Sequence, residues 1–198
     1  MTHQHNEKPA LLIIDMVKDN FVESRNLPIT PLAKQIIPPI NNLIRAFRME
    51  NWPVVFSTDS FHEADFIFTA RMKPHAVAGT EGAEVIDELD RTEEDLWLPK
   101  PRFSAFFKTD LDSWLREKDI TLCAVAGIAT NFCVLTTVMD AICHDFKSVI
   151  LEDCTAASFE KNHQQILDNY RRNPLYPLLK VATSSELLDD LRDPGSHM

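Results

Sequence analysis

The chain has 198 residues, a formal net charge of −10 and a hydrophobic share of 44%. This composition is typical of a soluble globular protein that is large enough for one full core. The acidic balance, without any cluster of Lys and Arg, argues against a nucleic-acid or anionic-membrane partner. The apolar runs are too short for a membrane-spanning helix.

The ends of the chain and its cysteines indicate the compartment. Residues 1–8 contain no apolar segment, so no secretory signal is visible. Four cysteines without CxxC spacing are typical of reduced thiols, and we therefore expect a cytoplasmic protein. We predict one domain over residues 9–192, preceded by a flexible tail over 1–8. The tail over 193–198 ends in GSHM, which looks like a cloning remnant.

The first half of the chain predicts two strands and a helix. The apolar run at residues 10–14 is typical of a central parallel strand and ends at Asp15. Residues 31–50 have helical spacing, but Pro38 and Pro39 interrupt it, so the helix could begin only after them. A second strand over 53–58 ends at Asp59. Residues 59–82 have no clear period, and a long loop of this kind is more often functional than decorative.

The second half alternates strands and helices, which indicates an α/β fold. We predict a three-layer, doubly wound, mostly parallel six-stranded sheet with helices on both faces. No GxGxxG or GxxxxGK[ST] motif occurs, so nucleotide binding has no support in the sequence. The predicted elements are strands over 95–98, 120–125, 147–152 and 179–182, and helices over 110–118, from about 131, over 160–171 and over 185–191.

Cys133 has the most informative position in the chain. It lies at the first turn of a helix that begins where a strand ends. The helix dipole at such a place favours an anion and lowers the pKa of a thiol. We interpret Cys133 as functional and Cys123 and Cys143 as core residues. The alternative for Cys133 is a small core hydrophobe, which is the commoner role of a cysteine.

Reactive side chains follow three predicted strands: Asp15, Lys100 and Cys133. Strand ends gather at one edge of a parallel sheet, so these residues can converge. A carboxylate could take the thiol proton while an ammonium holds the carboxylate and the thiolate. Taken singly, the aspartate would more often be a turn residue and the lysine a solvated one; the joint pattern favours a catalytic set.

Three segments resemble the isochorismatase-like cysteine hydrolases, the group with nicotinamidases and N-carbamoylsarcosine amidase. They are residues 10–16 (ALLIIDM), 100–109 (KPRFSAFFKT) and 127–137 (GIATNFCVLTT), and residues 153–158 (DCTAAS) are also similar. The likeness runs from about residue 9 to 185. It implies a catalytic triad of Asp15, Lys100 and Cys133 and a cis peptide bond between Ile128 and Ala129. It also implies an oxyanion hole formed by the amides of Ala129 and Cys133.

The resemblance implies an amidohydrolase, because true isochorismatases of this group generally lack the cysteine. The expected reaction is hydrolysis of a C–N bond in a small amide, nicotinamide-like or carbamoyl/ureido, through a covalent acyl-enzyme. Three alternatives stay open: isochorismatase-type hydrolysis of another small substrate, thiol redox chemistry with Cys154 as a possible partner, and a non-catalytic binding role.

The covalent chemistry requires no cofactor, but a zinc site is a further hypothesis. Nicotinamidases carry an Asp-x-His pair after the second strand and a later His that bind zinc or another divalent ion. Here Asp59, His62 and His75 could form an open metal site, although His62 is displaced by one position from the family's spacing.

The aromatic residues suggest a pocket wall and an assembly. We predict Phe21, Phe61 and Trp97 in the substrate pocket, with Phe66 and Phe68 as further candidates. Apolar residues in the 59–82 loop, where Ile67 joins the phenylalanines, favour coverage by a second subunit. The family commonly forms dimers or tetramers, so we expect a homodimer or homotetramer.

Overall fold

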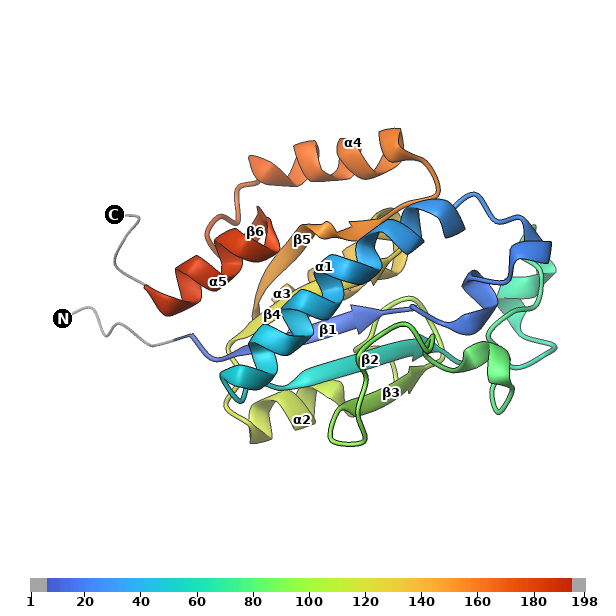
Figure 1. Ribbon diagram of the computed structural model, residues 1–198, viewed down its shortest axis with the longest axis horizontal. Helices are drawn as coiled ribbons and strands as arrows, with labels where there is room; N and C mark the ends of the chain where they lie inside the picture. Colours follow the sequence, from blue (N-terminus) through green and yellow to red (C-terminus); the bar gives the residue numbers. More distant parts are fainter. Residues whose placement is uncertain (1–6, 194–198) are drawn as a thin grey trace.

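A six-stranded sheet forms the centre of the structure, a computed structural model that describes residues 7–193 (Figure 1). The strands are β1 (Pro9–Ile14), β2 (Val54–Asp59), β3 (Leu96–Lys100), β4 (Leu122–Ile128), β5 (Lys147–Ala156) and β6 (Leu179–Ala182). The helices are α1 (Thr30–Met49), α2 (Leu111–Glu117), α3 (Leu135–Cys143), α4 (Glu160–Arg171) and α5 (Ser184–Arg192).

The strand order is β3-β2-β1-β4-β5-β6, and every neighbouring pair is parallel. This arrangement confirms the predicted three-layer, doubly wound α/β fold. The order reverses between β1 and β4, because the chain first proceeds outward to β3 and then returns to the other side of β1. A reversal of this kind leaves a crevice at the carboxyl ends of the strands, where open α/β sheets bind ligands.

Two apolar clusters cover the two faces of the sheet. Alternate side chains of β1 point to opposite faces, so Leu11 and Ile13 pack with α1 and α5. Leu12 and Ile14 pack with α2, α3 and α4 on the other face. Every residue of β1 is buried, as expected of a central strand covered on both sides.

Helix α1 continues through Pro38 and Pro39, so the expectation that it could begin only after them is wrong. Proline removes the amide that would bond to the carbonyl four residues earlier. Here those carbonyls belong to Lys34 and Gln35, which are exposed, so water can take the missing hydrogen bonds. The apolar face of the helix remains buried against the sheet and stabilises the continuous form.

The ends of the described chain differ in part from the predicted tails. Lys8 donates its amide to Thr121 Oγ1 at 3.0 Å and accepts from the Thr121 amide at 2.9 Å. Lys8, which the prediction placed in the tail, is therefore held in place by hydrogen bonds to Thr121. The rest of the predicted tails, residues 1–6 and 194–198, lies outside the described residues. Within residues 7–193, no helix has the length and hydropathy needed to cross a membrane.

Candidate active site

Four polar side chains meet at the carboxyl ends of four adjacent strands. Asp15 follows β1, Asp59 and Lys100 end β2 and β3, and Cys133 lies in the turn after β4. The register pairs Asp59 directly with Lys100. The sheet therefore places all four residues beside the reversal of strand order between β1 and β4, where ligands are expected.

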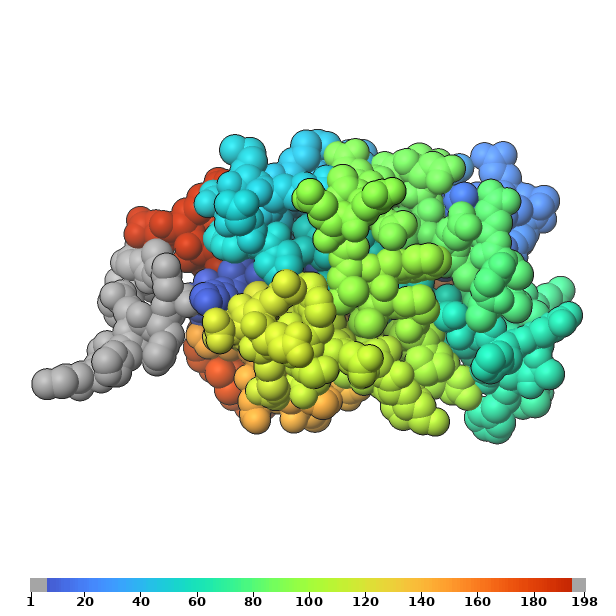
Figure 2. All heavy atoms as spheres, turned by 90° about the horizontal axis from the view of Figure 1, so that it is seen from below, coloured from blue at the N-terminus to red at the C-terminus, as the bar shows by residue number. Residues whose placement is uncertain are grey.

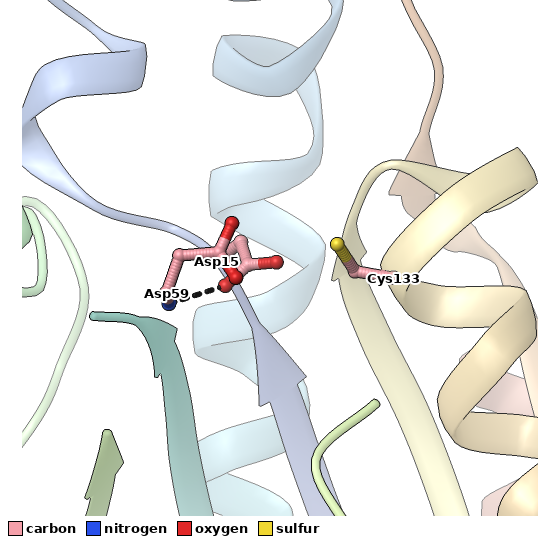
Figure 3. Close-up of side chains that lie close together, drawn as sticks. All are labelled: Asp15, Asp59 and Cys133. Atoms are coloured by element: carbon pink, nitrogen blue, oxygen red, sulfur yellow. Dashed lines mark hydrogen bonds between the residues drawn. The ribbon is translucent and has the colours of Figure 1, made fainter. Parts of the chain in front are cut away.

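Lys100 connects the two carboxylates. Its Nζ donates to Asp15 Oδ2 at 2.9 Å and also to the Asp59 carboxylate. The other oxygen of Asp15 accepts the backbone amide of Asp59 at 2.7 Å (Figure 3). The lysine is fully buried, and a buried charge is tolerated only when opposite charges and hydrogen bonds surround it.

Cys133 completes this group. Its Sγ and one carboxylate oxygen each from Asp15 and Asp59 lie within 4.8 Å of one another. Figure 3 shows the thiol on the turn after β4, across from the Asp15 carboxylate. The structure thus brings Asp15, Lys100 and Cys133 together and adds Asp59, which the sequence had suggested only as a metal ligand.

A close approach of β1 and β4 shapes the backbone next to the thiol. A Cβ on Gly127 would lie 2.1 Å from the Ile14 carbonyl oxygen, and the φ of Gly127 is +102°. Only glycine fits this conformation and this contact. The next peptide bond, between Ile128 and Ala129, is cis.

A π-helical turn over Thr130–Val134 carries the thiol into α3. The Ala129 carbonyl accepts the amides of Phe132 at 2.9 Å and Val134 at 3.3 Å. Ala129 and Cys133 both line the cavity described below. Both residues proposed for the oxyanion hole therefore border the same space.

Sequence reasoning missed a buried contact beneath this turn. Thr130 Oγ1 lies 2.9 Å from His163 Nδ1 on α4, and both side chains are buried. Burial lowers the pKa of His163, while Glu160 and Glu152 oppose that change. A neutral ring can accept the threonine hydroxyl hydrogen. The threonine stands within the 127–134 motif, but no pattern in α4 singles out His163.

Burial and mutual charge set the protonation of the acidic and basic groups. Burial, followed by the neighbouring Asp15, raises the pKa of Asp59 to about 7, and Lys100 opposes this rise. Burial alone would lower the pKa of Lys100, but Asp15, Cys133 and Asp59 together raise it above its ordinary value. The lysine is therefore a permanent cation of the site.

The pKa of the Cys133 thiol differs from the sequence-based prediction. The position at a helix start predicted a lowered pKa, whereas burial and then the Asp15 charge raise the pKa of Cys133 well above its ordinary value. Lys100 acts in the opposite direction without reversing the result. Burial of the sulfur and the negative charge of the nearby carboxylates both disfavour the thiolate. The resting site thus holds a protonated thiol beside a carboxylate.

The prediction that Cys123 and Cys143 are core residues is only partly correct. Cys123 is buried in β4 as expected, but Cys143 is exposed because it lies on the outer side of α3, so its interpretation as a core residue is wrong. Cys154 is buried in the cluster beneath α1, whereas Cys133 packs with the cluster on the opposite sheet face. A redox pair of Cys133 and Cys154 therefore has no support in the geometry.

A cavity of about 730 Å³ opens above the polar group. Asp15, Asp59 and Cys133 line its floor, and Phe103 and Phe132 contribute aromatic side chains. The ring centroids of these two phenylalanines are 6.3 Å apart. A space of this size suits a small molecule.

The three aromatic residues predicted for this pocket do not line it, so that prediction is wrong. Phe21 packs against the α1 side of the core. Phe61 is fully buried beneath the loop with Phe68. Trp97, in β3, points elsewhere and donates its indole N–H to Thr58 Oγ1 at 2.9 Å. Apolar type alone did not indicate which side of the chain faces the cavity.

The 59–82 loop buries most of the apolar residues that were expected to be exposed. Phe61, Ile67 and Phe68 pack in a small cluster of the loop's own. Phe66 alone of the four remains open, at 77% exposure. Figure 2 shows this loop, in teal and green, at one end of the molecule, and Figure 1 shows that the strand arrows of β1 and β2 point toward the same end.

The predicted metal ligands do not form a set. His62 is exposed, and His75 bonds through Nδ1 to the Lys73 carbonyl at 3.0 Å while its ring packs on Phe61. Asp59 is instead bound by Lys100. The donor atoms of Asp15, Asp59 and Cys133 are close together, but the Lys100 ammonium already bonds to both carboxylates. These residues therefore do not fit a zinc ion held as predicted.

Asp19 ties together two loops above the cavity. Its carboxylate accepts the Ala76 amide at 2.7 Å and pairs with Arg25 at 3.1 Å. Arg25 in turn donates to the Pro74 carbonyl at 3.3 Å. A Cβ on Gly82 would lie 2.5 Å from the Asp19 carboxylate, so the absence of a side chain there makes room for it.

Comparison with known proteins identifies the family. The isochorismatase domain matches residues 9–185. The chain belongs to the isochorismatase family. A protein of Arabidopsis thaliana called a probable inactive nicotinamidase is 32% identical over 170 residues, which cover 80% of this chain and 86% of that protein.

Two solved structures extend the comparison to amidases of this family. The N-carbamoylsarcosine amidase of Thermoplasma acidophilum aligns with a TM-score of 0.77 and 32% identity, covering 89% of this chain and 96% of that one. The pyrazinamidase of Pyrococcus horikoshii in complex with zinc aligns with a TM-score of 0.76 and 26% identity, covering 89% and 99%. The family thus includes amidohydrolases that act on small amides.

Proposed function

We propose that this chain is a cysteine hydrolase that cleaves the C–N bond of a small nicotinamide-like or carbamoyl/ureido amide. One observation carries the proposal. A buried carboxylate, Asp15, lies between the Lys100 ammonium and the Cys133 thiol on the floor of a cavity. A nucleophile, a base and a group that orients the base are the parts that acyl transfer through a thioester requires.

The proposed reaction proceeds in two balanced steps. Asp15 accepts the thiol proton as Cys133 Sγ attacks the amide carbon, and the amides of Ala129 and Cys133 bind the developing oxyanion. The tetrahedral adduct then collapses, and protonated Asp15 gives its proton to the departing nitrogen, which leaves as an amine or ammonia. Water next attacks the thioester and loses a proton to Asp15, which gives this proton to the Cys133 sulfur as the acid is released.

The raised thiol pKa is consistent with this order of events. A permanent thiolate would add a negative charge beside Asp15 and Asp59. Transfer of the proton to Asp15 during the attack keeps the charge of the pair constant, and Lys100 stabilises both forms. The thiol, carboxylate and ammonium suffice for this chemistry, so we propose that it requires no metal, and ammonia release should be unchanged by EDTA.

The test is ammonia release from a panel of small amides by the wild-type chain and by Cys133→Ala. Loss of the nucleophile should lower the rate by at least about a thousandfold, with the free energy of unfolding nearly unchanged. Cys143→Ala, which changes an exposed cysteine outside the cavity, should retain full activity. A Cys133→Ala protein with more than about one part in a thousand of the activity would contradict the covalent mechanism.

A further inference from the structure

The cavity is lined by charged side chains of both signs. Its floor carries the carboxylates of Asp15 and Asp59, with Lys100 beneath them. Its lining also includes the cationic side chains Arg25, Arg71 and Lys73, and no further acidic residue. This concentration of positive charge occurs in a chain of net charge −10, so it is not a consequence of average composition.

Two of these cations have no ionic partner. Within residues 7–193, the side chains of Arg71 and Lys73 take part in no ion pair and no side-chain hydrogen bond, whereas most surface cations of this chain pair with a carboxylate. Both residues are exposed, and they lie two positions apart in the loop after β2. They are available to an incoming anion.

The third cation is held in place. Arg25 pairs with Asp19 at 3.1 Å and bonds to the Pro74 carbonyl at 3.3 Å, next to Lys73. Asp19 also fixes the Ala76 amide. The loop after β1 and the loop after β2 are thus joined at the cavity, and Figure 2 shows their blue and teal to green residues at the same end of the molecule. This connection orients the guanidinium before any ligand arrives.

We propose that the substrate is a small amide or ureide carrying a carboxylate at the end remote from the scissile bond, and that Arg25, Arg71 and Lys73 bind this carboxylate. The inference rests on the proposed hydrolysis at Cys133. The acidic floor repels the carboxylate and the cationic lining attracts it, so the neutral amide is directed toward the thiol. A charged substrate therefore enters in one orientation.

The experiment compares acids with their neutral esters. The probes are N-carbamoylglycine, succinamic acid and the methyl ester of each, because each ester keeps the amide and loses the charge. Their dissociation constants are measured by calorimetry on Cys133→Ala, in which turnover cannot consume the ligand. We expect at least one acid to bind about tenfold more tightly than its ester, the effect of one charge-assisted hydrogen bond. Added salt should weaken binding of the acid and leave the ester unchanged.

Variants assign the effect to the cationic residues. In the Cys133→Ala background, Arg71→Met with Lys73→Met should raise the dissociation constant of the acid about tenfold and leave that of the ester unchanged. Arg172→Met removes one exposed cation that does not line the cavity, and it should change neither value. Equal affinity for acid and ester, failure of every acid to bind, or equal losses for both ligands in the double variant would overturn the proposal.

Turnover separates this inference from the function on which it rests. Ammonia release by the wild-type chain is measured with the same four compounds. Acids that bind through Arg71 and Lys73 but release no ammonia would leave the carboxylate site standing and contradict the amidohydrolase. Ammonia released equally from acids and esters, with equal affinities, would support the hydrolase and overturn the carboxylate site.

Discussion

The floor of the cavity and its cationic lining are built by different kinds of structure. The floor residues Asp15, Asp59 and Lys100 stand at the ends of paired strands, where hydrogen-bonded register fixes their positions. The lining residues Arg71 and Lys73 stand in a loop and are exposed. The strand ends can therefore keep the same reactive residues in place, while sequence changes in the loops alter which substrate binds.

Removing Lys100, the buried cation of the cavity floor, should have the largest effect on stability and activity. Lys100→Met would leave the Asp15 and Asp59 carboxylates buried without their partner, which should cost about 3–5 kcal/mol of stability. It should also abolish ammonia release and move alkylation of Cys133 by iodoacetamide to higher pH, because Lys100 lowers the pKa of that thiol.

Urea unfolding and the pH profile of alkylation measure these two effects. Lys161→Met, at an exposed position on α4, provides the matched control. An unchanged alkylation profile in Lys100→Met would remove the lysine from the proposed role.

The support beneath the catalytic turn should have the next largest effect. His163→Ala leaves the buried Thr130 hydroxyl without its partner, a change that costs about 1–3 kcal/mol. If the pair positions the Cys133 turn, kcat should fall while KM for the amide remains the same. Thr130→Val and the double variant complete a cycle, in which the second substitution should cost less than it does alone. Additive losses would show that the two side chains act independently.

The raised pKa of Asp59 on the cavity floor predicts that the free energy of unfolding depends on pH. The pKa of Asp59 is about 7 in the folded protein and 3.8 for an unperturbed aspartate, so the folded state binds the extra proton between these values. The stabilisation is present in full below the lower value and is lost as the pH rises through the upper one, at a rate on the order of 1 kcal/mol per pH unit.

Urea unfolding from pH 4 to pH 8 tests this expectation. Asp59→Asn retains an oxygen that can accept from Lys100 but has no carboxyl proton to lose. Its stability should fall less steeply over this range than that of the wild-type chain. Parallel curves for the two proteins would place the titration elsewhere.

The smallest effect concerns the loop region and the proposed homo-oligomer. Light scattering at micromolar concentration should give a mass that is a multiple of 22.6 kDa, as a dimer or tetramer. Phe66→Ser changes the exposed phenylalanine of the 59–82 loop and should weaken the assembly with little effect on the stability of one subunit. A wild-type mass near 22.6 kDa would contradict an oligomer.

The success of sequence reasoning follows the same division between strands and loops. The apolar runs and the residues that end them predicted the parallel sheet and the convergence of Asp15, Lys100 and Cys133, because strand direction alone gathers strand ends. Loop side chains have no such periodicity. Phe21 and Phe61, which lie in loops, therefore turned out not to line the cavity, and His62 is exposed.

Properties that depend on surroundings were also beyond the sequence. The raised thiol pKa of Cys133 results from burial and from the nearby carboxylate of Asp15, which only the folded arrangement reveals. The same holds for the partnership of Thr130 with His163, because the two side chains come from different elements. A motif indicates which residues take part in a site but not the electrostatic environment that they share.

The contact between Gly82 and Asp19 has a consequence for how this protein can diverge. Any side chain at position 82 would collide with the carboxylate that holds Arg25. Drift at position 82 is therefore coupled to positions 19 and 25, although it touches no ligand itself. In homologues, a bulkier residue at position 82 should therefore accompany replacement of Asp19 and Arg25. A change at position 82, which lies outside the cavity, would then mark a change of substrate.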